Sequence, residues 1–248
     1  MDPISPLPKK NSLPESYWEQ AGSASYAEAM YSSEGVERHI RQRSWNLLTD
    51  VGLSLGMTPQ SRILDLGCGD GAFANQQLAK FFTQVEGYDL SVAGIERANT
   101  QRALPDFHFH TADLTTMDYA SLTPYDGVFM VGILHHVKPH AAAIVKALRH
   151  VAPRVVVLEP NGMHPARKLL ELTPSYRRAG EQSFSATAVV RMFEDAGYEL
   201  KRFHRQGLFP NFTPPMILRA LKPLEEWIEA SRILSLSCTA SVFGFVRK

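Results

Sequence analysis

A glycine-rich segment, placed between an apolar run and a helical pattern, has the residue types needed to hold a ligand. It reads Ile63-Leu-Asp-Leu-Gly-Cys-Gly-Asp-Gly71. Gly67 and Gly69 would let the backbone turn sharply and approach a bound molecule without interference from a Cβ atom. The same glycines, followed by Ala72, also satisfy the relaxed fingerprint of a dinucleotide-binding turn. The spacing therefore predicts a ligand-binding turn and leaves two classes of ligand open.

Acidic residues around this turn favour one of the two classes. Asp65 and Asp70 flank the turn and would repel a pyrophosphate, whereas a ligand with a positive charge would be attracted to them. Asp89 follows about 20 residues beyond the turn, where an acid accepts hydrogen bonds from both hydroxyls of a ribose. The ribose contact suits either class, but the flanking acids favour a cationic ligand.

A second group of polar residues could supply acid–base chemistry. His135 and His136 follow one apolar run, and Glu159 ends the next. If both runs are parallel strands, these side chains lie at the carboxyl edge of the sheet, where open α/β folds bind ligands. A histidine there could remove the proton of an attacking hydroxyl. Glu159 could pair with a histidine, with an acceptor hydroxyl, or with Arg167 or Lys168, and one histidine could instead pack under the following helix.

Two further segments are candidates for contacts with an acceptor molecule. The stretch 160–184 is long for a connection and is expected to form part of a pocket, with His164, Tyr176 and Arg177 as candidate substrate-binding residues. The run Arg38-His-Ile-Arg-Gln-Arg43 is basic and helical in pattern. It is either a solvated helix face or a patch for an anionic acceptor.

The elements that must position these residues are the strands and helices of an α/β fold. Between Arg62 and Glu159, short apolar runs alternate with helical patterns, which indicates a parallel sheet with crossover helices. The run Val155-Val-Val-Leu158 has no polar alternation, as expected for a strand covered on both faces. The predicted strands are Arg62–Leu66, Gln84–Asp89, Phe107–Thr111, Asp126–Val131 and Arg154–Glu159, with Tyr198–Arg205 and Ser241–Arg247 suited to be the sixth and seventh.

The helices have recognisable boundaries. Asp70 precedes a helix whose inner face would carry Ala74, Leu78 and Phe81, and Ser91 can cap a helix with Ile95 and Ala98 inward. Pro139 is expected in the first turn of a third helix. Ser185 opens a fourth helix that Gly197 stops. Residues 15–57 also show helical spacing of apolar residues.

Four ordered segments resemble the motifs of class I S-adenosylmethionine-dependent methyltransferases. They are Ile63–Ala74, Glu86-Gly-Tyr-Asp-Leu-Ser91, His110-Thr-Ala-Asp-Leu114 and Tyr125–Val137. The resemblance implies a Rossmann-like α/β fold. It would have a mainly parallel seven-stranded sheet with an antiparallel final strand, helices on both faces and helical cap insertions. The methyltransferase domain is then expected over 58–248. The long connections 160–184 and 207–235 are its insertions, the helical pattern at 15–57 predicts a helical cap before it, and the proline-rich residues 1–14 predict a disordered tail.

The resemblance implies roles for the matching positions. Asp65 and Gly67 would surround the methionine part of the cofactor, and Asp89 would hold its ribose. Val131 and Gly132 would present carbonyls toward the ammonium group. Around the adenine, Leu90 would contact the ring face and Asp113 would accept a hydrogen bond from the amino group. The remaining predicted cofactor contacts are Cys68, Gly69, Ala112 and Leu114.

Composition limits the other possibilities. The net charge of +1 argues against a protein whose main task is to grip a nucleic-acid backbone. Two cysteines, far apart in sequence, cannot build a disulfide framework or a zinc cluster. The start of the chain lacks a signal-peptide pattern, and Ile233–Val246 is too short and too interrupted to span a membrane. We expect a cytoplasmic protein without a metal and without a membrane or nucleic-acid partner, and the sequence leaves the oligomeric state open.

These patterns predict methyl transfer from S-adenosylmethionine, with S-adenosylhomocysteine as product, to a small molecule. The acceptor atom is predicted to be a hydroxyl oxygen of a sugar, a glycan precursor or a natural-product intermediate, because the two histidines offer a base. A nucleic-acid or protein methyltransferase, a nicotinamide-dependent oxidoreductase and a catalytically idle cofactor-binding module remain alternatives.

Overall fold

The structure is a computed structural model that describes residues 31–164 and 183–248. Its centre is a seven-stranded sheet in the order β3-β2-β1-β4-β5-β7-β6. The strands are β1 (Arg62–Leu66), β2 (Gln84–Asp89), β3 (Phe107–Thr111), β4 (Gly127–Val131), β5 (Arg154–Pro160), β6 (Tyr198–Gln206) and β7 (Ala240–Arg247). The strands β1 to β5 pair in parallel, and β7 runs antiparallel between β5 and β6. The predicted α/β fold with an antiparallel final strand is confirmed.

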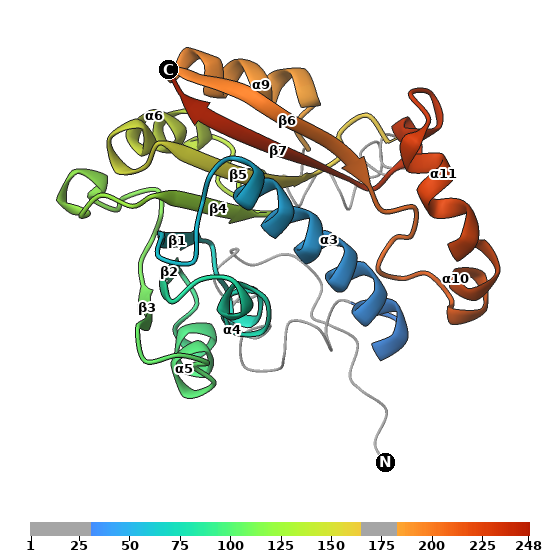
Figure 1. Cartoon of the computed structure of the whole chain (residues 1–248), viewed down its shortest axis with the longest axis horizontal. Helices are drawn as coiled ribbons and strands as arrows, with labels where there is room; N and C mark the ends of the chain where they lie inside the picture. The colour runs from blue at the N-terminus through green and yellow to red at the C-terminus, as the bar shows by residue number, and fades with distance from the viewer. Residues whose placement is uncertain (1–30, 165–182) are drawn as a thin grey trace.

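Helices cover both faces of this sheet (Figure 1). The described α-helices are α3 (Glu34–Ser54), α4 (Ala72–Gln76), α5 (Val92–Thr100), α6 (Ala141–Val151), α9 (Ala186–Asp195), α10 (Pro215–Leu221) and α11 (Glu225–Ala230). The described 3-10 turns are η1 (Leu78–Lys80), η2 (Tyr119–Ser121), η3 (Lys222–Leu224) and η4 (Leu234–Ser237). The helices α6 and α9 lie on one face, and α3, α4 and α5 lie on the other.

The apolar run in β5 illustrates why the sheet is buried on both sides. Val155 and Val157 belong to the core beneath α6 and α9, whereas Val156 belongs to the core beneath α3. All three side chains have no solvent exposure. A strand without polar alternation is stable only where both faces are covered, so the prediction for this run is confirmed.

Several predicted helix boundaries are confirmed by their caps. The Ser91 side chain accepts from the Gly94 N–H at the start of α5, and the Ser185 side chain accepts from the Ala188 N–H at the start of α9. Gly197 follows α9 with φ of +85°, a left-handed conformation that favours glycine. These local contacts fix where the crossover helices begin and end.

The helix after the glycine turn differs from its prediction. Here α4 ends at Gln76, and a 3-10 turn takes over at Leu78. Phe82, not the predicted Phe81, is the fully buried ring. The change from α to 3-10 geometry shifts which side chains face inward, and a 3.6-residue pattern cannot anticipate it. Pro139 also lies two positions before α6, which begins at Ala141.

Much of the basic run on α3 is paired with acids, while Arg38 is exposed. Arg43 lies 2.7 Å from Glu229 and 3.3 Å from Glu225, and His39 Nε2 lies 2.7 Å from the buried Glu225. Arg41 pairs with Glu37 one turn away. The acids of α11 therefore pair with His39 and Arg43 and dock α11 on α3. Among the described residues, no helix combines the length and apolarity needed to cross a membrane.

Candidate active site

The glycine turn joins β1 to α4 in a backbone conformation that other residues rarely adopt. Gly67, Gly69 and Gly71 have φ of +76°, +57° and +71°. A Cβ atom on Gly67 would also lie 2.6 Å from the Ile133 side chain. Both the left-handed φ values and the lack of space require glycine here. The sequence thus creates a turn whose backbone can approach a ligand closely.

Asp89, at the end of β2, supports this turn directly. Its Oδ2 accepts from the Gly69 N–H at 2.9 Å, and its Oδ1 accepts from the Ser91 N–H at 2.9 Å. Burial raises the pKa of Asp89, although these backbone bonds work in the opposite direction. Each carboxylate oxygen keeps a second acceptor site, so the group could still bind two ribose hydroxyls.

Asp65 lies in β1, two residues before Gly67, and one of its carboxylate oxygens is buried and unpaired. The residue is 1% exposed, and its Oδ2 has no hydrogen-bond partner. Burial, with a smaller contribution from the charge of Asp89, raises the pKa of Asp65 to about 7. A buried carboxylate without a partner is costly. A ligand with an ammonium group would satisfy it, so the donor set fits the methionine end of S-adenosylmethionine.

The predicted adenine contacts gather at the ends of β2 and β3. Leu90 is 37% exposed, and the Ala112 N–H donates to the Asp89 carbonyl at 2.8 Å, which holds the two loops together. Leu114 is buried. Asp113 Oδ1 accepts from both the N–H and the hydroxyl of Thr115, and these bonds lower its pKa. Asp113 therefore has a local structural role beside any contact with adenine.

The end of β4 forms the other side of the turn. Gly132 has φ of +68°, and its N–H donates to the Leu158 carbonyl at 2.7 Å. The preceding residue, Val131, is partly exposed. Cys68 is buried, and burial raises the pKa of its thiol, so it is neutral packing beside the turn.

The structure brings the three catalytic candidates together but gives them different surroundings. Glu159 is 1% exposed; its Oε1 accepts from the Leu134 N–H at 2.8 Å, and its Oε2 lies 2.9 Å from His135 Nδ1. His136 is exposed, and its ring centre lies 3.9 Å from that of His135. Of the pairings left open for Glu159, the described one is with His135. The carboxylate fixes both the loop after β4 and the orientation of the His135 ring.

Asn161, which the sequence places at the carboxyl edge directly after β5, connects the site to the 207–237 segment. Its side-chain amide donates to the carbonyls of Leu236 and Cys238 at 3.1 and 2.8 Å, and its Oδ1 accepts from the Met163 N–H. The residue is 1% exposed. A buried asparagine directly after a strand could have indicated such a link, but its partners are distant in sequence.

The remaining predicted site residues give less information. The His164 N–H donates to the Asn161 carbonyl at 3.0 Å, so this residue lies beside the end of β5. Tyr176 and Arg177 lie outside the described residues. Within 31–164 and 183–248, no group of three or more His, Cys, Asp or Glu residues could hold a metal ion.

A family model described as a methyltransferase domain matches residues 37–202, more than half of the chain. The chain belongs to this family. The resemblance to class I S-adenosylmethionine-dependent methyltransferases is thereby confirmed, and with it the enzyme class and the methyl donor. The matched range contains the glycine turn, Asp89 and the Glu159–His135 pair.

Curated relatives of this methyltransferase act on different atoms, as their names state. An O-methyltransferase of Penicillium expansum is 28% identical over 125 residues, which is 48% of this chain and 45% of that protein. An indolepyruvate C-methyltransferase of Streptomyces griseus is 28% identical over 60% of this chain and 50% of that protein. A phosphoethanolamine N-methyltransferase of Arabidopsis thaliana is 25% identical over 68% of this chain and 36% of that protein. The chain thus matches half or less of the length of each of these relatives.

Solved structures share the fold over nearly the whole chain. The magnesium protoporphyrin IX methyltransferase of Synechocystis, solved with bound SAH, is 18% identical with a TM-score of 0.63 and covers 94% of this chain and 98% of its own. The [4+2]-cyclase SpnF, at 14% identity, has a TM-score of 0.65 and covers 98% of both chains. These likenesses support the fold and do not identify the acceptor.

Proposed function

We propose that this methyltransferase transfers the methyl group of S-adenosylmethionine to a hydroxyl of a small molecule, with His135 as the general base. The acceptor class is a sugar, a glycan precursor or a natural-product intermediate. The observation that carries this proposal is the contact between Glu159 and His135 Nδ1, 2.9 Å long and at the carboxyl edge of the sheet.

The geometry of this pair suits proton removal from a hydroxyl. With its Nδ1–H donated to Glu159, His135 has the lone pair of Nε2 available to accept a proton. The carboxylate then stabilises the imidazolium ion that forms, as in other acid–histidine pairs. Because Glu159 is also held by the Leu134 N–H, the ring orientation is set before the acceptor arrives.

The donor end of the reaction is assigned to the turn between β1 and α4. When bound, S-adenosylmethionine supplies a methyl carbon activated by its sulfonium. Asp65 would pair with the ammonium group and Asp89 would hold the ribose. Most of the remaining task is to hold the acceptor hydroxyl in line with that carbon and away from water.

The test uses methyl-labelled S-adenosylmethionine and a metabolite extract to find the acceptor, followed by kinetics on two matched variants. We expect His135→Gln to lower turnover by roughly 10²–10⁴-fold, the usual contribution of a general base. His136→Gln, the exposed neighbour, is the control and should keep most of the turnover. Both variants should bind S-adenosylhomocysteine like the wild type.

Two outcomes would overturn the proposal. If His135→Gln retains full turnover at saturating cofactor, the base is not His135. If the labelled methyl group appears on nitrogen or carbon and not on oxygen, the acceptor class is wrong, whereas the family assignment still holds.

A further inference from the structure

Pairing in the sheet places three polar side chains in a row at its carboxyl edge. Glu159 on β5 lies opposite Ser241 on β7, and Ser241 lies opposite Arg205 on β6. Residues directly opposite each other in antiparallel strands point to the same face. The row therefore begins at the carboxylate that holds His135 and extends across two strands to Arg205, on the face that carries α6 and α9.

Two atoms in this row lack partners. The Ser241 hydroxyl is buried in a residue that is 2% exposed, and it makes no hydrogen bond. The Arg205 Nε is also buried without an acceptor. Its guanidinium lies 5.0 Å from the centre of the Phe203 ring, which supports its position. A buried donor without an acceptor costs free energy, so two of them side by side indicate a place for an acceptor group from a ligand.

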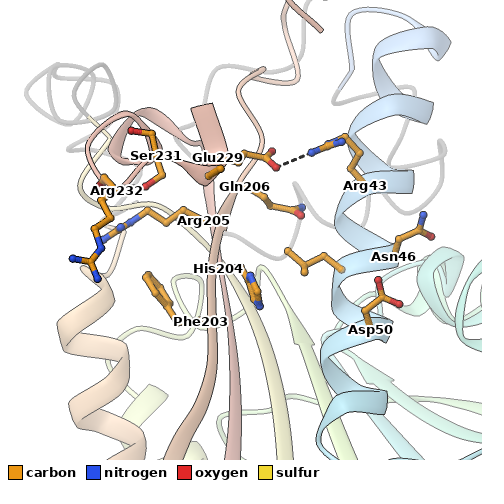
Figure 2. A pocket seen from close by; sticks show the side chains of 13 residues that line it. Arg43, Asn46, Asp50, Phe203, His204, Arg205, Gln206, Glu229, Ser231 and Arg232 are labelled. Atoms are coloured by element: carbon orange, nitrogen blue, oxygen red, sulfur yellow. Dashed lines mark hydrogen bonds and ion pairs between the residues drawn. The ribbon is translucent and has the colours of Figure 1, made fainter. Parts of the chain in front are cut away.

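A hollow of about 810 Å³ opens along the edge of β6 at this point, and Arg205 and Arg232 both line it (Figure 2). Both guanidinium groups extend to the side of β6 away from α3. Among the described residues, neither is paired with a carboxylate, and Glu229, three residues before Arg232, is held by Arg43 at 2.7 Å. Asp50 also lines the hollow, but it belongs to α3. Ser241 does not itself line the hollow, but it lies opposite Arg205 in the sheet, and the part of the hollow at Arg205 and Arg232 is positively charged.

We propose that Arg205, Ser241 and Arg232 form a subsite for an oxyanion, either a carboxylate or a phosphate, carried by the methyl acceptor. This inference rests on the proposed function and narrows its acceptor to anionic small molecules. Neighbouring strands are about 4.8 Å apart, so the backbone of Arg205 lies about 10 Å from that of Glu159. The acceptor thus has its hydroxyl at one end and its anionic group at the other, with a short molecular body between.

The first experiment measures anion binding to the full chain saturated with S-adenosylhomocysteine. Inorganic phosphate and acetate are titrated separately, which distinguishes the two kinds of oxyanion. We expect one of them to bind, and Arg205→Gln to weaken that binding by about tenfold, because it removes a charge-assisted hydrogen bond. The control is Arg202→Gln, which removes an exposed arginine from the same strand and should leave the affinity unchanged.

The variant Ser241→Ala distinguishes a role of the hydroxyl in anion binding from a role in the stability of the fold. If the hydroxyl serves the ligand, anion affinity falls severalfold while the melting temperature stays the same or rises, since an unsatisfied buried group has been removed. Unchanged anion affinity in Ser241→Ala would remove Ser241 from the subsite. Absence of anion binding in the wild type, or equal binding in Arg205→Gln, would overturn the proposal as a whole.

The same proteins distinguish failure of the subsite from failure of the proposed function. S-adenosylhomocysteine affinity is measured first and should be equal in all variants. If the wild type fails to bind S-adenosylhomocysteine, the proposed function fails. If it binds that ligand and transfers methyl groups to neutral hydroxyl compounds as well in Arg205→Gln as in the wild type, and no anionic acceptor is preferred, only the subsite fails.

Discussion

The two halves of the carboxyl edge are built differently. Around β1 and β2 the edge is a glycine turn with positive φ at Gly67 and Gly69, with the carboxylates of Asp65 and Asp89 beside it. Around β5, β7 and β6 it is made of side chains, from Glu159 across Ser241 to Arg205. A cofactor common to a whole family suits a fixed backbone cradle. An acceptor that differs between relatives suits side chains that can be exchanged without disturbing the turn.

The largest loss of cofactor binding is expected from a substitution in the glycine turn between β1 and α4. Gly67→Ala forces a left-handed φ on a residue with a Cβ, at about 1–2 kcal/mol, and adds a contact 2.6 Å from Ile133. We expect loss of measurable S-adenosylhomocysteine binding and a lower melting temperature. The control is Gly35→Ala, where the nearest neighbour of a Cβ, the Ser33 hydroxyl, is 4.0 Å away; it should leave binding unchanged. Normal binding by Gly67→Ala would contradict the backbone cradle.

A substitution of Asn161 tests whether the part of the edge around β5, β7 and β6 can be disturbed without weakening cofactor binding. Asn161→Ala removes side-chain hydrogen bonds to Leu236, Cys238 and Met163, and we expect a loss of about 2–3 kcal/mol in the free energy of unfolding. Chemical denaturation measures this loss. Cofactor affinity should stay within a factor of about two, since the turn at Gly67 is untouched. An equal loss of cofactor affinity would show that the two halves are coupled.

Asp89 should matter mainly for affinity. Asp89→Ala is expected to weaken S-adenosylhomocysteine binding by about 1–3 kcal/mol, because charge-assisted bonds to the ribose are removed. Calorimetric titration measures the change, with the exposed Asp106→Ala as a control for loss of one negative charge. An unchanged affinity in Asp89→Ala would refute the ribose contact.

The raised pKa of Asp65 predicts that cofactor affinity depends on pH. Its pKa of about 7 is far above the ordinary value of 3.8, so folding takes up a proton and the free protein loses stability as pH rises through that interval. A bound ammonium favours the ionised carboxylate. Affinity for S-adenosylhomocysteine should therefore rise about tenfold from pH 6 to pH 8, with release of a proton on binding.

Calorimetry in buffers of different ionisation enthalpy detects that proton. Asp65→Asn is the matched control: it should bind more weakly and lose the dependence on pH in this range. A flat pH profile in the wild type would show that Asp65 does not face the ligand's ammonium group.

The same division explains what could be predicted from the sequence. The turn, Asp65, Asp89 and the parallel strands are encoded within short segments, so local spacing was enough to find them. Glu159 lies near the end of β5 and His135 follows the neighbouring strand β4, and their pairing was one of the alternatives. The row through Ser241 could not be predicted, because it depends on the register of β7 between two strands from distant parts of the chain. The acids of α11 that neutralise Arg43 are equally distant from it in sequence.

The location of β7 also has a consequence for the order of folding. The strand β6 is attached to the sheet only through β7, and β7 pairs with β5 between residues 80 to 92 positions apart in the chain (Pro160 with Ala240, Arg154 with Val246), compared with 64 positions for β1 and β4 (Ile63 with Gly127). Contacts between distant segments cost more loop entropy and form later. We therefore expect the glycine turn between β1 and α4 to form before β7 and β6 join the sheet. Pulse-labelled hydrogen exchange would detect this sequence as early amide protection in β1 and β4 and delayed protection in β6.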